Sequence, residues 1–360
     1  MTEEKWIVYP LRLEILTPVI INSGKTFDYG EIVIDDEDNA KQINLIKAAR
    51  FFSPCLLNQM VQEVSKRGSS YSESRVFPFL KRLMSEHPEI VETNLDFLSF
   101  ARTRFQESPG MEISKITVDR LTGRPYIPGS SLKGAIRTAL LEAMRIEKKI
   151  GNPDYSTRGR NLSRNFEAGL FSDEFRFKVQ DDPFRDIKVS DFILEKDSGR
   201  LFIGEASYSP TTIYSEMTDA SVLHESKTVV AHGTISISSR IRETGIHYFD
   251  DMKMLLAKTS RFYIDAFKGG TKTKCDKNGV TDHWTQVGLL LEAVTNNGGY
   301  PLRVGHYSGI ENMTLNVEQN LEFNRRIHNP KINTEGANTL HMIERKYLAG
   351  FCALFLEDEK

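Results

Sequence analysis

Residues 125–138 read PYIPGSSLKGAIRT and contain three local signals in close succession. Tyr126-Ile127 is typical of a short strand, and Pro128-Gly129 is typical of a tight turn. Apolar residues then recur three and four positions apart, which predicts an amphipathic helix that Ser130 or Ser131 caps. The apolar stripe of this helix, the best-defined element of the sequence, consists of Leu132, Ile136, Ala139, Leu140, Ala143 and Met144.

The start of this helix has the properties of an anion site. Its first backbone N–H groups and the helix dipole present partial positive charge. Lys133 and Arg137 add full charges on one face, and Gly134 costs about 1 kcal/mol of helix propensity relative to alanine, which indicates a close approach to the backbone. The pattern fits either a phosphate site or a capped helix with two solvated cations. The candidate residues are Gly129, Ser130, Ser131, Lys133, Gly134 and Arg137.

Strand and helix patterns on both sides of this segment predict a mixed α+β chain. Helical spacing dominates residues 42–107 and 250–267, whereas 272–279 is typical of a basic loop. At about 150 residues per domain, a chain of 360 residues is expected to form two domains. Alternating or β-branched runs predict strands within 6–21, 113–118, 187–194, 229–241 and 349–356.

The composition is that of an ordinary globular protein, with 39% hydrophobic and 27% charged residues. No apolar run approaches the ~20 residues of a membrane span, and the first residues do not follow the order of a signal peptide. We therefore expect a cytoplasmic protein that contacts no membrane. Lys and Arg total 47 and Asp and Glu total 49, so any nucleic-acid site is expected to be local rather than spread over the surface.

A second glycine-dense stretch occupies residues 296–309, NNGGYPLRVGHYSG. Such a loop can lie along a sugar-phosphate backbone while an aromatic ring stacks on a base. A long hairpin is the alternative explanation of the same residues. The candidate RNA-binding residues of this loop are Arg303, Gly305, His306, Tyr307, Ser308 and Gly309.

Motifs of the common enzyme classes are missing from the sequence, including the serine nucleophile elbow, the phosphate loop and HExxH. Cys55, Cys275 and Cys352 are too far apart for a CxxC pair, and no histidine has a partner at metal-ligand spacing. We expect no metal site, no cofactor and no catalytic residue.

Residues 123–137, GRPYIPGSSLKGAIR, resemble the hallmark motif of the RAMP superfamily of CRISPR-associated proteins. Residues 16–24, followed by Asp28-Tyr29, are similar to the first strand and loop of one family within it, the fifth subunits of type III-A Csm effector complexes. Val189-Ser190-Asp191 resembles a strand end of that family, and 303–309 resembles its C-terminal glycine-rich loop. The loop departs from the family pattern because His306 and Tyr307 interrupt its glycines.

The resemblance implies an α+β fold of two ferredoxin-like (RRM-like) RAMP modules. The first would span residues 1–185, with a helical insertion at about 42–107, and the second 186–360, with the glycine-rich loop at 296–309. It also implies a non-catalytic, RNA-binding subunit that caps the complex at the 3′ end of the CRISPR RNA (crRNA) and supports crRNA 3′-end maturation in antiviral defence. The implied partners are the 3′ portion of crRNA and the repeated RAMP backbone subunit, with the small helical subunit, target RNA and host nucleases as further candidates.

Two other interpretations stay open. A RAMP endoribonuclease that processes crRNA or cleaves target RNA would need a general acid or base such as His306, or a metal-assisted Asp28. Asp28 falls near the position at which the related backbone subunit has its cleaving aspartate. A RAMP subunit of another type III complex would have the same physical properties and different neighbours.

Overall fold

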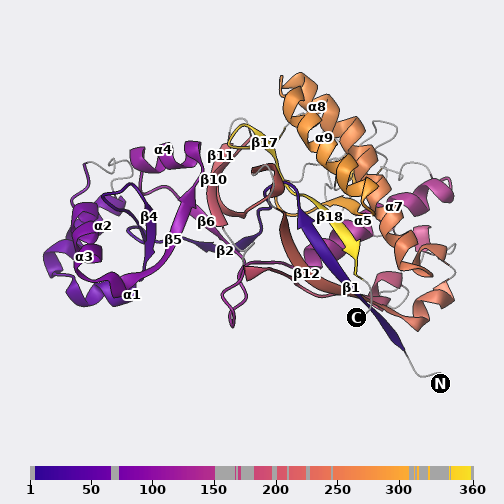
Figure 1. The fold of residues 1–360 in the computed structure, drawn as a ribbon, viewed down its shortest axis with the longest axis horizontal. Helices are drawn as coiled ribbons and strands as arrows, with labels where there is room; N and C mark the ends of the chain where they lie inside the picture. Colours follow the sequence, from indigo (N-terminus) through magenta and orange to yellow (C-terminus); the bar gives the residue numbers. More distant parts are fainter. Residues whose placement is uncertain are drawn as a thin grey trace.

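The computed structural model of the chain describes residues 5–65, 73–150, 167, 169–171, 182–196, 201–208, 211–223, 228–244, 246–307, 312, 314–315, 323–324, 340 and 342–357. These residues form a seven-stranded sheet and a nine-stranded sheet, with helices packed against both. Figure 1 shows an elongated molecule, in which the first sheet lies around β1 and the second leads to a lobe at the opposite end. The expected α+β fold class is confirmed.

The first sheet is built around β1 (Trp6–Ile15). This strand pairs antiparallel with β12 (Val229–Ser238) along its whole length and with β18 (Phe351–Leu356) over its second half. Strands from opposite ends of the chain therefore lie side by side (Figure 1). The other strands of this sheet are β7 (Tyr126–Ile127), β8 (Ile187–Val189), β9 (Phe192–Leu194) and β13 (Tyr300–Arg303).

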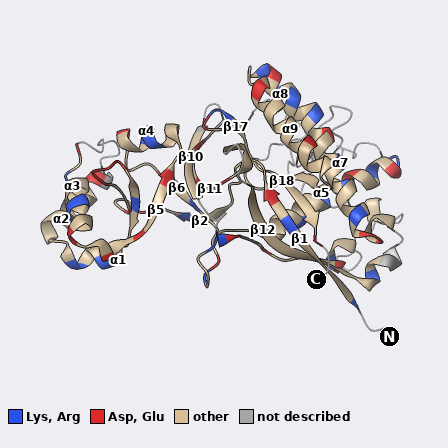
Figure 2. Cartoon of the chain, in the orientation of Figure 1, with Lys and Arg blue, Asp and Glu red and all other residues tan. Residues whose placement is uncertain are grey.

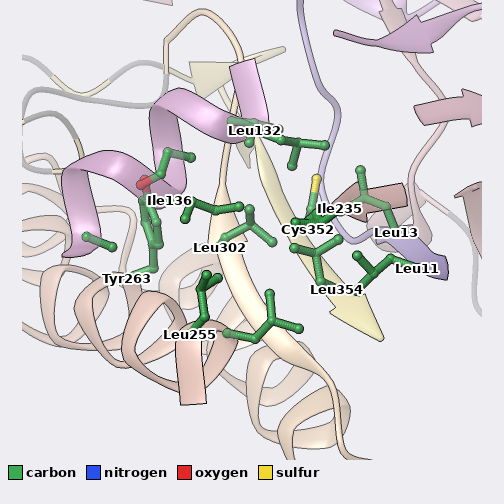
Figure 3. Packing of buried hydrophobic residues seen from close by; sticks show 14 of the residues in the cluster. Leu11, Leu13, Leu132, Ile136, Ile235, Leu255, Tyr263, Leu302, Cys352 and Leu354 are labelled. Atoms are coloured by element: carbon green, nitrogen blue, oxygen red, sulfur yellow. The ribbon is translucent and has the colours of Figure 1, made fainter. Parts of the chain in front are cut away.

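Two helices, α5 (Gly129–Glu147) and α7 (Met252–Ala266), cover one face of the first sheet. Figure 3 shows Leu132 and Ile136 of α5 and Leu255 of α7 packed toward Leu302 and neighbouring side chains of the sheet. The predicted apolar stripe of α5 thus faces the largest core of the protein. The Tyr263 hydroxyl on α7 donates a hydrogen bond of 3.2 Å to the carbonyl oxygen of Ala135 and joins the two helices.

The opposite face of the sheet packs against α9 (Thr281–Asn296). Successive side chains of a strand point to opposite faces, so Cys352 and Leu354 enter the α5–α7 core while Phe351 and Phe355 enter the core under α9. The apolar run of β18 is therefore explained by burial on both sides.

Residues 272–279, expected to be a basic loop, are mostly helical, and that prediction is wrong. α8 (Lys272–Lys277) follows a π-helical turn at Phe267–Thr271. Cys275 is fully buried in the core under α9, and Lys272 pairs with Asp276 one turn later at 2.8 Å. Tertiary burial and an i,i+4 ion pair outweigh the lysine-rich composition.

The second sheet carries α4 (Ser99–Glu107) on one face. Ala101 and Phe105 of α4 are buried against Ile113 and Ile203 of the sheet. The strands of this sheet are β2 (Asn22–Thr26), β3 (Ile32–Ile34), β4 (Ala40–Ile43), β5 (Val91–Phe97), β6 (Ile113–Ile116), β10 (Leu201–Tyr208), β11 (Thr211–Thr218), β16 (Met342–Ile343) and β17 (Tyr347–Leu348).

The lobe at the far end contains α1 (Leu45–Ala48), α2 (Pro54–Ser65) and α3 (Val76–Glu86), with a core of its own. These helices lie inside the expected helical insertion, which also contributes β5 to the second sheet and α4 to one of its faces. Short 3-10 helices occur at Ala49–Phe51, Pro88–Ile90, Pro183–Asp186, Ser221–Leu223, Ser239–Thr244 and His247–Phe249, and β14 (Thr314–Leu315) pairs with β15 (Phe323–Asn324).

The expected boundary between residues 185 and 186 lies within the 3-10 helix Pro183–Asp186. Both sheets contain strands from both sides of that position. In the first sheet, β1 and β7 precede it and the other strands follow it. In the second sheet, β10, β11, β16 and β17 follow it and the other strands precede it. The division into modules 1–185 and 186–360, and their ferredoxin-like character, stay predictions.

Candidate nucleic-acid interface

The start of α5 is fixed by the turn that contains Asp191. The Gly129 N–H donates a hydrogen bond of 2.8 Å to Oδ1 of Asp191. A Cβ atom on Gly129 would lie 2.5 Å from the carbonyl oxygen of Ser190 and overlap that of Val189, so a side chain would push the two segments apart. Ser190 is itself bonded to β12, since its Oγ accepts from the Thr234 N–H at 2.8 Å. Residues of the 123–137 motif and of the Val189-Ser190-Asp191 motif are thus in direct contact.

Neither serine caps the helix, and that expectation is wrong. α5 begins at Gly129, and no side chain of the N-cap position bonds to its first turn. The carbonyl oxygen of Pro128 instead accepts from the N–H groups of Ser131 at 2.9 Å and Leu132 at 3.3 Å. Because the helix starts earlier than expected, Ser130 lies in its first turn with an exposed side chain.

The two cations of the first turns are engaged within the protein. Lys133 Nζ donates to the carbonyl oxygen of Ile187 at 2.7 Å, and burial lowers the pKa of this amine. Arg137 Nη1 lies 2.8 Å from both carboxylate oxygens of Asp182, and its Nη2 lies 2.7 Å from Oε2 of Glu167. Burial alone would lower the pKa of Arg137, but these carboxylates raise it. The Arg137 side chain is only 17% exposed.

Gly134 faces open space. A Cβ atom built at this position would have no heavy atom within 4 Å, and the residue is partly exposed. No packing contact among the described residues therefore requires glycine here or offsets its cost in helix propensity.

The glycine-rich loop is pinned to residues 17–21. Gly305 has φ +88°, and a Cβ atom there would lie 2.8 Å from the carbonyl oxygen of Ile20, which also accepts from the His306 N–H at 2.8 Å. Both the left-handed backbone and the close approach favour glycine at this position. His306 is exposed and Tyr307 is half-buried, with their ring centroids 6.0 Å apart.

Arg303 holds the loop to the end of the chain. Its side chain is buried, Nε donates to the carbonyl oxygen of Ala349 at 2.7 Å, and the guanidinium lies 4.5 Å from the Phe351 ring centroid. Gly350 completes the junction, because its N–H donates to Pro18 and its carbonyl oxygen accepts from Val304. Ser308 and Gly309 lie outside the described residues.

The helix start and the loop border the same core. Leu132 of α5 and Leu302 and Val304 beside the loop belong to one hydrophobic cluster. Lys, Arg, Asp and Glu are interspersed along the ribbon in Figure 2 rather than gathered on one side of that view. With a net charge of −2, any nucleic-acid interface of this protein is expected to be local.

The candidate residues of the nuclease interpretation lie in different settings. Asp28 lines a cavity of about 800 Å³ together with Tyr29, Arg104 and Glu112, between the start of β3 and the end of α4. His306 lies in the glycine-rich loop described above. Within the described ranges, no group of three or more His, Cys, Asp or Glu side chains could hold a metal ion. Among the same residues, no helix is long and apolar enough to cross a membrane.

Comparison with family models identifies the family of this chain. The model of the RAMP superfamily matches residues 12–321, which is most of the chain. The chain belongs to the RAMP superfamily. No curated protein matched in the corresponding search.

Two solved structures share this RAMP fold over nearly their whole length. One is the crystal structure of T. onnurineus Csm5, with 17% identity, a TM-score of 0.63, and coverage of 95% of this chain and 99% of that chain. The other is a chain of the cryo-EM structure of a Csm–crRNA–target RNA ternary complex of a type III-A CRISPR–Cas system, with 16% identity, a TM-score of 0.60, and coverage of 97% and 100%.

Several residues that shape the RAMP hallmark were not predicted as its partners. The sequence presents Asp191 only as part of a motif, and no sequence pattern singles out Asp182 or Glu167 as a partner of α5. The one sequence signal for Asp182 is its position before Pro183, where its carboxylate accepts from the Phe184 N–H at 3.0 Å and caps a 3-10 helix. No spacing rule links these acids to α5.

Proposed function

We propose that this protein is the non-catalytic RNA-binding subunit that caps a type III-A Csm complex at the 3′ end of its crRNA. The observation that carries the proposal is the near-complete mutual coverage with Csm5 and with a chain of a Csm–crRNA–target RNA complex. Its partners would be the 3′ portion of crRNA and the repeated RAMP backbone subunit. The small helical subunit, target RNA and host nucleases are further partners that this role admits, and we expect a cytoplasmic location.

The interface for RNA would consist of backbone and small polar groups more than of free cations. Ser130 is exposed at the α5 start, Gly134 leaves the helix open, and His306 projects from the pinned loop. Arg137 and Arg303 are engaged by carboxylates and a carbonyl oxygen, and would act by holding these surfaces in place. We therefore expect weak RNA binding by the isolated chain and firm retention within the complex.

Purification of the tagged chain from its own host tests the proposal, with sequencing of the bound RNA and identification of the bound proteins. Short RNAs that share a repeat-derived 5′ tag, in a large assembly of several subunits, are the expected result. Loss of the subunit should leave crRNA with unmatured 3′ ends. A lone protein without RNA, or one with heterogeneous unprocessed RNA, would overturn the proposal.

A RAMP endoribonuclease is the second candidate function, and the position of Asp28 at the 800 Å³ cavity favours it. Incubation of purified protein with repeat RNA or target RNA distinguishes the two functions. Discrete products that disappear with Asp28→Ala or His306→Ala would support the nuclease. Intact RNA in the presence of divalent cations would support the non-catalytic subunit.

A further inference from the structure

A hollow of about 580 Å³ lies between α4, the β10–β11 hairpin and the turn that joins β16 to β17. Figure 1 shows α4 beside β10 and β11. Phe100, Arg104 and Glu107 line the hollow from α4, Glu205 and Tyr214 from the hairpin, and Arg345 from the turn. Its volume falls within the range of small-molecule sites.

The turn at the mouth of this hollow is strained. Glu344 and Arg345 have φ values of 51° and 55°, and the Lys346 N–H closes the turn on the carbonyl oxygen of Ile343 at 2.9 Å. Two successive left-handed residues define a turn in which Asn-Gly is strongly preferred. Non-glycine residues are found in such strained conformations where surrounding contacts hold them there, often at functional sites.

The Glu344 side chain stabilises the fold through hydrogen bonds to backbone groups. Its carboxylate accepts hydrogen bonds from the N–H groups of Phe100 at 2.6 Å, Ala101 at 3.2 Å and Glu205 at 2.8 Å. It therefore caps α4 and ties that helix to β10, which is a sufficient reason for its strained backbone.

Arg345 makes fewer contacts within the protein than Glu344 does. Its Nε donates to Oε1 of Glu205 at 2.9 Å, and its guanidinium lies 4.9 Å from the Phe100 ring centroid. The side chain is nevertheless 62% exposed, and in the described part of the chain its two terminal nitrogens have no partner. A planar donor group is thus held above an aromatic ring at the mouth of the hollow.

The charges around the hollow balance. Arg345 is paired with Glu205, and Arg104 is paired with Glu107 at 3.0 Å. Two cations and two anions give an anionic phosphate no net attraction. They do offer donors and acceptors in one place, next to the exposed ring of Phe100. An uncharged planar ligand with both donors and acceptors on its edge matches this lining, and a nucleobase is such a ligand.

We infer that this hollow binds an unpaired nucleobase of RNA, stacked against Phe100 and the Arg345 guanidinium, with its edge toward the two Arg–Glu pairs. The RNA source rests on the proposed function, whereas the recognition of a base follows from the hollow itself. The site would take a base that leaves the main RNA path, since none of its lining residues belongs to α5 or to the glycine-rich loop.

Saturation-transfer NMR with the full-length, RNA-free protein and the four ribonucleoside 5′-monophosphates tests this inference. We expect transfer to the base protons of at least one nucleotide. Arg345→Gly, which suits the left-handed backbone, and Phe100→Ala should each weaken its binding by about tenfold, as expected for lost stacking. Lys346→Ala is the matched control, because Lys346 is adjacent and exposed but does not line the hollow.

Three results would overturn the inference: no transfer to any base, unchanged transfer in both variants that keep their circular dichroism spectrum, or displacement of the nucleotide by ribose 5-phosphate alone. The last result would mean that the hollow holds the sugar-phosphate instead of the base. Because this assay contains no partner subunit and no guide, its failure leaves the capping proposal intact. Failure of that proposal appears instead as a tagged protein that purifies alone without RNA, or with heterogeneous unprocessed RNA.

Discussion

The backbone nitrogen of Gly129 and Oδ1 of Asp191, 62 residues apart in sequence, are joined by a hydrogen bond of 2.8 Å. A carboxylate of the chain itself therefore lies at the helix start where sequence alone suggests a phosphate. Such a carboxylate satisfies one of the free N–H groups of the first turn and interacts favourably with the helix dipole. RNA at the start of α5 would contact the groups that Asp191 does not bond, which include the exposed Ser130 side chain and the open side of the helix at Gly134.

Gly129→Ala should destabilise the protein by about 1–3 kcal/mol, because the new methyl group would overlap carbonyl oxygens of the Val189–Ser190 turn. Urea unfolding followed by circular dichroism measures the change. An unaltered midpoint would show that the turn can move aside without cost. Asp191→Asn keeps an acceptor for the Gly129 N–H, and we expect it to lose less stability than Asp191→Ala.

Gly134→Ala should have the opposite effect on stability. Open space surrounds this position, and alanine favours a helix by about 1 kcal/mol, so unfolding should shift to higher urea. If RNA approaches the helix here, the same substitution should weaken crRNA retention in the assembled complex. A variant with raised stability and unchanged retention would exclude Gly134 from the interface.

Arg137→Ala and Lys133→Ala test whether each cation of the first turns stabilises the fold or contacts RNA phosphate. Arg137→Ala leaves Asp182 and Glu167 without their partner and should cost about 2–4 kcal/mol of unfolding free energy. Lys133→Ala should cost less stability and, if its ammonium reaches a phosphate, lower the slope of log affinity against log salt by about 1. Salt titrations of RNA binding, together with urea unfolding, measure both effects. A slope that is equal in both variants and in the native protein would count against phosphate contacts by this helix face.

Glu216 should make the free energy of unfolding fall as pH rises from about 4.5 to about 7. Burial raises the pKa of its carboxyl from 4.5 to about 7, partly offset by the hydrogen bond from the Ile116 N–H. The folded protein then binds more protons than the unfolded chain between these values, so the free energy of unfolding decreases from about pH 4.5 to about pH 7, by roughly 3 kcal/mol in total.

Glu216→Gln is expected to remove this dependence while keeping an acceptor for Ile116. Urea unfolding at pH 5 and pH 8 should show a gain in stability for Glu216→Gln at pH 8 and little change at pH 5. Glu112→Gln, at an exposed position, is the control. An equal effect of Glu216→Gln at both pH values would contradict the prediction.

The sequence predicts α5 and most long strands well because their signals are local. The apolar stripe of α5 depends only on spacing within one helix, and the alternation in β12 depends only on neighbouring residues. By contrast, the 187–194 strand is divided into β8 and β9 by the Ser190–Asp191 turn, which is held by Thr234 and Gly129. No local pattern contains those contacts.

The candidate site shows the same limit. The sequence places Gly129 in a tight turn and Gly305 in a glycine-dense loop, but it does not show the neighbours that require glycine there, which are the Val189–Ser190 turn and Ile20. Residue type and position predict Arg137 as a cation at a helix start and Arg303 as an RNA-binding residue of the glycine-dense loop. Their partners come from residues 45 and 46 positions away, which spacing on a helix or strand does not predict.

The pairing of β1 with β18 has a consequence for how the protein is made. The Phe351 N–H donates a hydrogen bond to Thr17 Oγ1, 334 residues away in sequence. The first sheet therefore cannot be completed until nearly the whole chain has left the ribosome. At translation rates of about 5–20 residues per second, β1 waits roughly 20–70 s for that neighbour. Until β18 is made, the apolar side chains Leu11, Leu13 and Ile15 lack the strand on one side of β1, and nascent chains should depend on chaperones more than a protein with local strand pairing.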